Sequence, residues 1–520
     1  MYYKVLNSTL IILYIKVKLC DRMFSPSLNE VKKIAQNKEY KRIPIVYELL
    51  SDIATPIEVL RVLKSVSKHC YMLESIEDSQ KWGRYSFLGY DPLLEFTCQN
   101  GVVQIKGDSN FTELNDEETI IETDNPSDII RDLIIKNKSP KLEDLPPFTG
   151  GFVGYFAYDY IKYAEPSLNL DAENQDQFKD IDLMLFDKVI AFDNFRQKII
   201  LIVNMKTDEL EDNYAKACEE LKEIADLIKN GKKAEIKPLK LKSEFKPVFS
   251  CEKYSEMVRK AKDYIKEGDI FQVVLSNRIE ADIEGSLFDT YRVLRTTNPS
   301  PYMFYFSSDD IEIAGASPET LVKVNDRKLY TFPLAGTRPR GKTEKEDLEL
   351  EKDLLNDEKE LAEHNMLVDL GRNDIGRISE IASVSVDKYL SIERFSHVMH
   401  IGSTVSGILR SNLDALCAID SILPAGTLSG APKIRACEII NELEDNKRGI
   451  YGGAIGYVDL SGNLDTCISI RIAFARNNKV FIRSGAGIVA DSVPEKEFDE
   501  CMNKAAAVIN ALEMADGGLE

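Results

Sequence analysis

Glu363 is a carboxylate in a segment whose pattern predicts a helix. Residues 353–370 contain no glycine or proline, and three apolar residues recur at heptad spacing, Leu354, Leu361 and Val368. At spacings of three and four residues, Glu363 shares one helix face with Met366, Leu367 and Leu370. A carboxylate on an apolar face costs free energy unless a cation, a metal ion or a hydrogen-bond donor pairs with it. The alternative is an exposed glutamate at the edge of the apolar stripe.

Arg471 lies in a segment that predicts a β-hairpin over 465–483, with its turn at Asn477-Asn478. Four apolar residues alternate onto one face of this segment, namely Ile468, Ile470, Ile472 and Phe474. Arg471 therefore lies on the opposite face, and the simplest interpretation is that it points to solvent. Gly485 and Gly487 follow in a Gly-x-Gly motif whose backbone N–H groups could bind an anion, although this motif alone is a weak signal.

Glu500 and Lys504 are four residues apart on the polar side of the last predicted helix. This order favours an ordinary surface ion pair, which is the default interpretation. His397 and His400 are close together in a chain that has only 4 histidines. They could bind a metal or act as a general base. Because no cysteine or carboxylate lies at metal-ligand spacing, we favour acid–base chemistry for one histidine and packing for the other.

The elements that must position these residues favour an α+β fold. Predicted strands come in runs rather than alternating with helices, which indicates mainly antiparallel β-sheets packed as a sandwich flanked by helices. Segments 183–186 and 189–192 are predicted to form one buried strand pair. Ser250 and Gly268 are expected to begin and end a helix. Further helices are predicted at 344–370, 412–420, 432–443 and 495–512, and we expect Gly371 to end the first of these, with a turn over 373–376.

The composition limits the class of protein. The chain has 520 residues, of which 44% are hydrophobic, and a net charge of −20, which disfavours nucleic acid as a partner. Its 9 cysteines include no CxxC pair, as is typical of a cytoplasmic protein with reduced thiols. The apolar run 10–14 is too short to span a membrane. We interpret 1–22 as a non-native N-terminal extension, 23–207 as an N-terminal part, 208–249 as a charged helical connection and 250–520 as a catalytic part.

A set of motifs resembles the chorismate-utilising enzymes, and within them most closely the anthranilate synthase component I family. The motifs run in order from about residue 250 to the end: AGASPETL (314–321), PLAGTRPRG (333–341), DEKELAEHNMLVDLGRND (357–374), HVMHIGSTVSG (397–407), GTLSGAPKIRA (426–436), YGGAIGY (451–457), SIRIA (469–473), SGAGIVADSVPEKE (484–497) and ECMNKA (500–505). The N-terminal part also resembles the family through LES (73–75) and GGFVGY (150–155).

The resemblance implies a role for each site residue. Glu363 and Glu500 would hold Mg²⁺, which binds the ring carboxylate of chorismate and supplies the cation that Glu363 lacks. Glu319 would be the acid that helps the C4 hydroxyl leave, and His400 would assist the later loss of pyruvate. Lys504 would help at the ring carboxylate. The enolpyruvyl carboxylate would be held by Thr427, Tyr451, Arg471 and the backbone at Gly485 and Gly487.

Two positions separate the sister activities of the family. Relatives that make aminodeoxychorismate carry a nucleophilic lysine where this chain has Ala335, and relatives that make isochorismate or salicylate carry a lysine where it has Gln272. Both differences favour anthranilate synthase. The alternatives are aminodeoxychorismate synthase component I, and a catalytically inactive regulatory subunit, which the presence of the full residue set disfavours.

The resemblance also implies regulation and a partner. Feedback inhibition by tryptophan is expected at a site that includes Ser75, Pro301, Tyr302 and Met303, although Tyr302 and Met303 could also be plain strand core. The chain has no glutamine-hydrolysing elbow, so we expect ammonia to come from a separate glutamine amidotransferase subunit. The expected reaction converts chorismate and ammonia into anthranilate and pyruvate, the first step of tryptophan biosynthesis.

Overall fold

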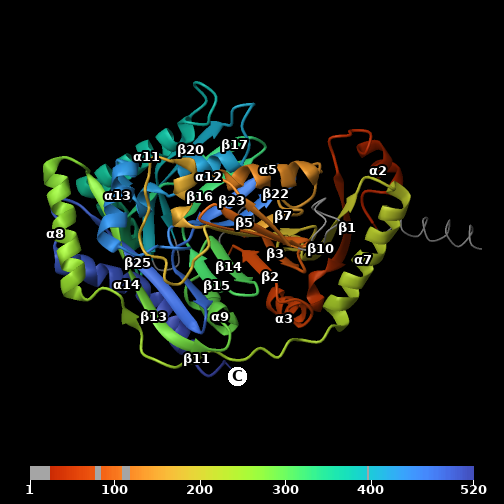
Figure 1. Ribbon diagram of the computed structural model, residues 1–520, viewed down its shortest axis with the longest axis horizontal. Helices are drawn as coiled ribbons and strands as arrows, with labels where there is room; N and C mark the ends of the chain where they lie inside the picture. The colour runs from red at the N-terminus through yellow and green to blue at the C-terminus, as the bar shows by residue number, and fades with distance from the viewer. Residues whose placement is uncertain (1–23, 76–82, 108–117, 395–397, 520) are drawn as a thin grey trace, which may run out of the picture.

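The computed structural model describes residues 24–75, 83–107, 118–394 and 398–519. Within these residues, two large antiparallel sheets pack face to face, and helices cover their outer faces (Figure 1). The predicted α+β class, with antiparallel sheets in a sandwich, is therefore confirmed. The predicted extension 1–22 and the candidate His397 lie outside the described residues. In the part of the chain that the structure describes, no helix is long and apolar enough to cross a membrane.

The first sheet contains strands from both halves of the chain. In spatial order its strands are β1 (Arg42–Leu50), β10 (Lys198–Lys206), β9 (Lys188–Asp193), β3 (Tyr85–Tyr90), β2 (Cys70–Glu74), β14 (Tyr302–Ser307), β15 (Glu312–Ser317), β24 (Ile472–Arg476), β25 (Lys479–Ile488), β13 (Gln272–Glu284) and β11 (Lys240–Leu241). Two short strands, β12 (Lys246–Pro247) and β21 (Gly430–Ala431), also pair with β13.

The second sheet mixes the two halves of the chain in the same way. Its order is β18 (Leu334–Pro339), β20 (Val398–Ile408), β17 (Lys328–Thr331), β16 (Thr320–Asn325), β23 (Leu464–Ile468), β22 (Ala454–Asp459), β7 (Gly151–Phe156), β8 (Ile181–Phe186), β4 (Leu94–Gln99), β5 (Val102–Gly107) and β6 (Glu118–Glu122). Strand β19 (Ser385–Arg394) pairs with β20. The division at 208–249 stays a prediction, but both sides of it supply strands to both sheets.

Helices close the two outer faces of the sandwich. Helices α3 (Pro56–Val66), α7 (Leu210–Asn230), α9 (Phe288–Thr297) and α14 (Pro494–Ala515) pack on the first sheet. Helices α5 (Pro126–Lys136), α11 (Glu358–Gly376) and α12 (Leu416–Ile422) pack on the second, along the upper side in Figure 1. The remaining helices are α2 (Leu28–Ile34), α6 (Ile161–Ala164), α8 (Cys251–Glu267), α10 (Glu344–Asn356) and α13 (Lys433–Glu444). As predicted, Ser250 caps α8 and a left-handed Gly268 ends it.

Short connections carry the chain from one sheet to the other. Asp187 joins β8 in the second sheet to β9 in the first, so the prediction that 183–186 and 189–192 pair with each other is wrong. Residues 318–319 join β15 to β16, and residues 469–471 join β23 to β24. Two buried strands joined by a single residue have the same sequence pattern whether they form a hairpin or belong to two different sheets.

The predicted hairpin over 465–483 is wrong in its first half for the same reason. Strand β23 belongs to the second sheet, and only β24 and β25 form the hairpin, with left-handed Asn477 and Asn478 at its turn. Arg471 has a φ of 52°, so the strand alternation breaks at this residue. Its direction is therefore set by the crossover between the sheets and not by the period of a strand.

The predicted helix 344–370 is two helices. Asp357 separates α10 from α11 because its carboxylate accepts hydrogen bonds from the backbone N–H groups of Lys359 and Glu360 at 3.1 and 3.2 Å. The expected end at Gly371 and the turn over 373–376 are wrong, since α11 continues to Gly376. A Cβ at Gly371 would lie 3.1 Å from Thr331 Cγ2, so this glycine serves close packing against β17.

Candidate active site

Two of the crossovers between the sheets meet and carry the principal charged residues. The backbone N–H of Ala316 donates to the carbonyl of Arg471 at 3.2 Å, and that of Ile468 donates to the carbonyl of Glu319 at 2.9 Å. Glu319 and Arg471 therefore lie on adjoining crossovers, although they are 152 positions apart in the sequence. Crossover residues are free of strand alternation, and both side chains can therefore turn toward one site.

The carboxyl group of Glu319 is poised to donate a proton. Burial raises its pKa to about 7, while a hydrogen bond from Thr427 Oγ1 at 3.0 Å and the charges of Arg471 and Lys504 act in the opposite direction. Glu319 therefore carries a proton on a substantial fraction of molecules at neutral pH. A carboxyl group in this state can act as a general acid.

Glu319 and Thr427 line a small cavity of about 40 Å³. A separate open cleft has a volume of about 760 Å³. It is lined by Arg471 and by one face of α14, including Glu500 and Lys504. Lys504 Nζ lies 2.8 Å from Glu500 Oε1 and donates to the carbonyl of Gly485 at 3.2 Å. The predicted surface pair is present, and it lies along the cleft with both side chains about half exposed, at 53% and 51%.

The remaining predicted substrate residues come from loops beside the crossovers. Thr427 lies in a short 3₁₀ helix, Gly426–Leu428, which contacts β25. Tyr451 is buried, and its loop is joined to the crossover because Gly452 N donates to Ser469 O at 2.9 Å. On β25, a Cβ at Gly485 would lie 2.6 Å from the carbonyl of Leu275, so only glycine fits there without a shift. The structure thus brings together residues that the sequence spreads over 319–504.

His400 lies on β20 at the edge of the cleft. Its Nδ1 is 2.8 Å from the carbonyl of Gly336 and 3.1 Å from Thr337 Oγ1, and Thr337 lines the cleft. Burial lowers the pKa of His400. The imidazole is therefore neutral at pH 7, the form in which it can accept or donate a proton.

Glu363 on α11 and Glu500 on α14 are close enough for the charge of Glu500 to affect Glu363. Glu363 is exposed, as in the alternative of a glutamate at the edge of the stripe. Although it is exposed, nearby protein atoms remove part of its hydration, and this desolvation, then the charge of Glu360 and more weakly that of Glu500, raises the pKa of Glu363. The described residues contain no cluster of three or more metal-ligating side chains. Two carboxylates fit Mg²⁺ nevertheless, since this ion commonly takes one or two protein carboxylates and completes its shell with substrate and water.

A separate site joins β2 to β14. Glu74 pairs with Met303 across the two strands, and continuing this register places Ser75 beside Tyr302, the residue after Pro301. Ser75 Oγ is buried and has no hydrogen-bond partner among the described residues. Met303 packs in the core, and the phenol of Tyr302 donates to Asp465 at 2.8 Å, so both also serve the packing of the strands.

Sequence reasoning missed a buried cluster of charge beside the glycine strand. Glu444, Arg448 and Arg483 are each no more than 2% exposed and bond to one another. The only signal in the sequence was a charged residue after an apolar run, as at Arg483, which follows Val480, Phe481 and Ile482.

A proton-holding carboxyl that feels the charges of an arginine and a lysine, with the lysine bonded to a glycine strand, is the kind of site expected in an enzyme that acts on an anionic substrate. Residues 68–510 match the model of the chorismate binding enzyme family. The chain therefore belongs to this family.

Named relatives and solved structures are similar over nearly the whole chain. Anthranilate synthase component 1 of Acetivibrio thermocellus is 45% identical, and the match covers 95% of this chain and 99% of the relative. The protein of the same name from Aquifex aeolicus is 44% identical, with 95% and 99% covered. The crystal structure of anthranilate synthase component I from Streptococcus pneumoniae aligns with a TM-score of 0.72 and 38% identity over 88% of this chain and 98% of that one.

Proposed function

We propose that this chain is the chorismate-binding component of an anthranilate synthase, which converts chorismate and ammonia into anthranilate and pyruvate. The observation that carries the proposal is Glu319, with a pKa of about 7, on a crossover that is hydrogen-bonded to the crossover of Arg471. The similarity to proteins named anthranilate synthase component 1 over 95% of the chain supports the same reaction.

The site residues divide the work between binding and proton transfer. Arg471, Thr427, Tyr451 and the backbone of Gly485 and Gly487 bind the enolpyruvyl carboxylate and orient the ring. Glu319 donates its proton to the C4 hydroxyl, which leaves as water while the nitrogen of ammonia bonds to C2. In the second half of the reaction the proton at C2 is removed and the bond from the ring to the enolpyruvyl oxygen breaks, which releases pyruvate. Neutral His400, at the edge of the cleft, assists this step.

Glu363 and Glu500 are the residues that would hold Mg²⁺. The ion would neutralise the ring carboxylate and fix its position. Lys504 is placed to contact the same carboxylate, because its ammonium lies between Glu500 and the carbonyl of Gly485.

Two partners follow from this function. Ammonia comes from a separate glutamine amidotransferase subunit, and tryptophan binds at Ser75 and Pro301 as a feedback inhibitor. Ser75 Oγ, which is buried without a hydrogen-bond partner among the described residues, supports a polar ligand at that position.

Anthranilate fluorescence tests the proposal directly. Purified protein is given chorismate, Mg²⁺ and a high concentration of ammonium at alkaline pH. A Mg²⁺-dependent signal is expected. If no anthranilate forms, and a lyase converts the product into para-aminobenzoate, the chain is the sister enzyme despite Ala335. If chorismate is not consumed at all, the proposal is wrong.

A further inference from the structure

Glu444 is the centre of the buried charge cluster. Its carboxylate accepts hydrogen bonds from Ser276 N at 2.7 Å and from Ser276 Oγ at 2.9 Å. It also accepts from Arg448 Nη2 at 2.6 Å and Nε at 2.9 Å, and from Arg483 Nη2 at 2.7 Å. A buried carboxylate is costly unless it is paired and hydrogen-bonded throughout, and here it is. The cluster is therefore a fixed unit of the protein interior.

Each arginine of the cluster also holds backbone groups. Arg448 donates to the carbonyls of Leu428 at 2.6 Å and Val274 at 2.7 Å. Arg483 donates to Ser276 Oγ at 2.7 Å and to the carbonyl of Lys447 at 3.0 Å. A guanidinium carries several donors in a rigid fork, so that each side chain fixes several chain segments at once.

The segments held by the cluster are those that carry the proposed substrate groups. Leu428 directly follows Thr427, which bonds to Glu319. The ring of Tyr451 lies 5.9 Å from the Arg448 guanidinium. On the sheet, Ser276 is opposite Gly485 in the pairing of β13 with β25. The cluster itself is too buried to touch solvent or substrate.

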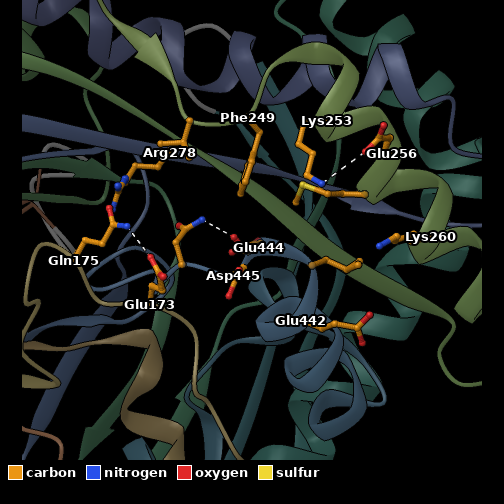
Figure 2. A pocket seen from close by; sticks show the side chains of 14 residues that line it. Glu173, Gln175, Phe249, Lys253, Glu256, Lys260, Arg278, Glu442, Glu444 and Asp445 are labelled. Atoms are coloured by element: carbon orange, nitrogen blue, oxygen red, sulfur yellow. Dashed lines mark hydrogen bonds and ion pairs between the residues drawn. The ribbon is translucent and has the colours of Figure 1, made fainter.

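A second cavity lies next to the cluster. Glu444 belongs to the wall of this cavity of about 350 Å³, whose rim carries charged side chains such as Lys253, Glu256 and Glu442 (Figure 2). Glu444 is nevertheless only 1% exposed, so a ligand in this cavity would meet the rim and not the cluster. Arg483 Nη1 also donates to Asn446 Oδ1 at 2.8 Å, and Asn446 lines this cavity, while the bonds to Leu428 and Ser276 lead toward Thr427 and Gly485.

We propose that Arg448 and Arg483 are positioning residues of the chorismate site. Arg448 acts through Leu428 and Tyr451, and so sets the place of Thr427 against Glu319. Arg483 acts through Ser276 on the strand that carries Gly485. One carboxylate balances two guanidinium groups, so the cluster also leaves one positive charge beneath the place where an anion binds. The inference rests on the proposed function and assigns it residues that do not contact the substrate.

The Arg448→Lys variant tests this role because lysine keeps the positive charge but lacks the guanidinium group that donates several hydrogen bonds at once. We expect kcat/KM for chorismate to fall by roughly 10- to 100-fold, as when a reacting group is misplaced by about 1 Å. The hydrogen bond from Thr427 lowers the pKa of Glu319. When this bond is weakened, the pKa rises, and the alkaline limb of the profile of kcat/KM against pH moves to higher pH. The assay is ammonia-dependent anthranilate formation at constant free ammonia.

Glu442→Gln is the matched control. Glu442 lies on α13 like Glu444, but it is at the rim of the second cavity and accepts a hydrogen bond from Tyr264. Wild-type kcat/KM and an unchanged pH profile are expected for this variant. An Arg448→Lys variant that is folded by circular dichroism and has wild-type kinetics would overturn the proposal.

A double-mutant cycle with Thr427→Ala separates positioning from general destabilisation. If Arg448 acts through Thr427, Arg448→Lys costs clearly less in the Thr427→Ala background than in the wild type. If the double variant loses kcat/KM by the product of the two single losses, Arg448 does not act through Thr427 and the proposal is contradicted.

Arg483→Lys gives a second test if Arg448→Lys does not fold. We expect KM for chorismate to rise about 10-fold, because a displaced strand weakens carboxylate binding in ground and transition state alike. The alkaline limb stays in place, since Thr427 is not affected. An unchanged KM would overturn the role of Arg483. Wild-type protein that makes no anthranilate would instead refute the proposed function itself.

Discussion

At the scale of single residues, the chemistry of this site depends on how the surrounding protein shifts the pKa of ordinary side chains. Burial raises the pKa of Glu319 to about 7 and lowers that of His400. The same low-polarity surroundings thus prepare one group to give a proton and keep the other uncharged. Glu319 lines a small cavity with Thr427, and His400 bonds to Thr337, which lines the open cleft.

Replacing Glu319 by glutamine should abolish most of the activity. Glutamine keeps the size of the side chain and the contact with Thr427, but it has no proton to give. We expect kcat to fall by about 100- to 10,000-fold, the range for loss of a general acid. The wild-type kcat/KM for chorismate should decrease above about pH 7 as Glu319 loses its proton. A profile that stays flat through this range at constant free ammonia would assign the proton donor elsewhere.

The carboxylates of Glu363 and Glu500 should determine the need for Mg²⁺. With either changed to glutamine, the Mg²⁺ concentration that gives half-maximal activity should rise at least about 10-fold, because one anionic oxygen ligand is lost. Glu358→Gln, in the first turn of the same helix α11, is the exposed control and should behave as wild type. Isothermal titration with Mg²⁺ and chorismate provides a readout without turnover. Equal Mg²⁺ dependence of all these proteins would show that the ion binds elsewhere.

At the scale of elements, glycines let the central strands of the second sheet lie close together. Gly154 on β7 is opposite Gly456 on β22. A Cβ at Gly154 would lie 2.0 Å from the carbonyl oxygen of Asp182 on β8, and its φ of 153° is unfavourable for other residues. Strand β22 continues into β23 and then into the crossover of Arg471, so this packing supports the site.

Gly154→Ala should therefore destabilise the protein. The added methyl group forces β7 and β8 apart, and we expect the free energy of unfolding to fall by about 2–3 kcal/mol. Chemical denaturation followed by circular dichroism measures this change. Gly376→Ala on α11 is the control, because a Cβ there has no neighbour within 4 Å, and it should be neutral or slightly stabilising. Equal stability of the two variants would contradict the close packing.

At the scale of the whole molecule, strands from both ends of the chain share each sheet. The pairing of β2 with β14 joins the N-terminal part to the catalytic part, and β14 continues through β15 to Glu319. Glu74, at the end of β2, receives hydrogen bonds from Arg295 on α9, at 2.9 Å from its Nη2, and from Tyr291. A ligand that binds at Ser75 therefore acts on elements that lead directly to the acid residue.

Tryptophan inhibition should be lost when Ser75 is enlarged. In Ser75→Leu the side chain fills the proposed site, and the concentration of tryptophan for half-inhibition should rise at least about 10-fold, which corresponds to about 1.4 kcal/mol of binding free energy. Activity without tryptophan should remain close to wild type, since Ser75 is outside the cleft. Ser65→Ala, an exposed position at the end of α3, is the control. Undiminished inhibition of Ser75→Leu would place the effector site elsewhere.

The sequence by itself determined the fold class, most element positions and the family. These features depend on residues that are close together in the sequence. They are strand alternation, the helix signals at Ser250 and Gly268, and the motifs around Glu319, Arg471 and Gly485. The motifs also supplied every predicted site residue, although they could not say how these residues meet.

The tertiary structure alone decided the sheet crossovers and the environment of each charge. Asp187, Glu319 and Arg471 stand at points where the chain leaves one sheet for the other, and an uninterrupted apolar alternation hides such a change. The pKa of Glu319 and the cluster around Glu444 depend on atoms far away in the sequence. Burial and pairing arise only when distant segments pack together, and for this reason no local pattern could predict them.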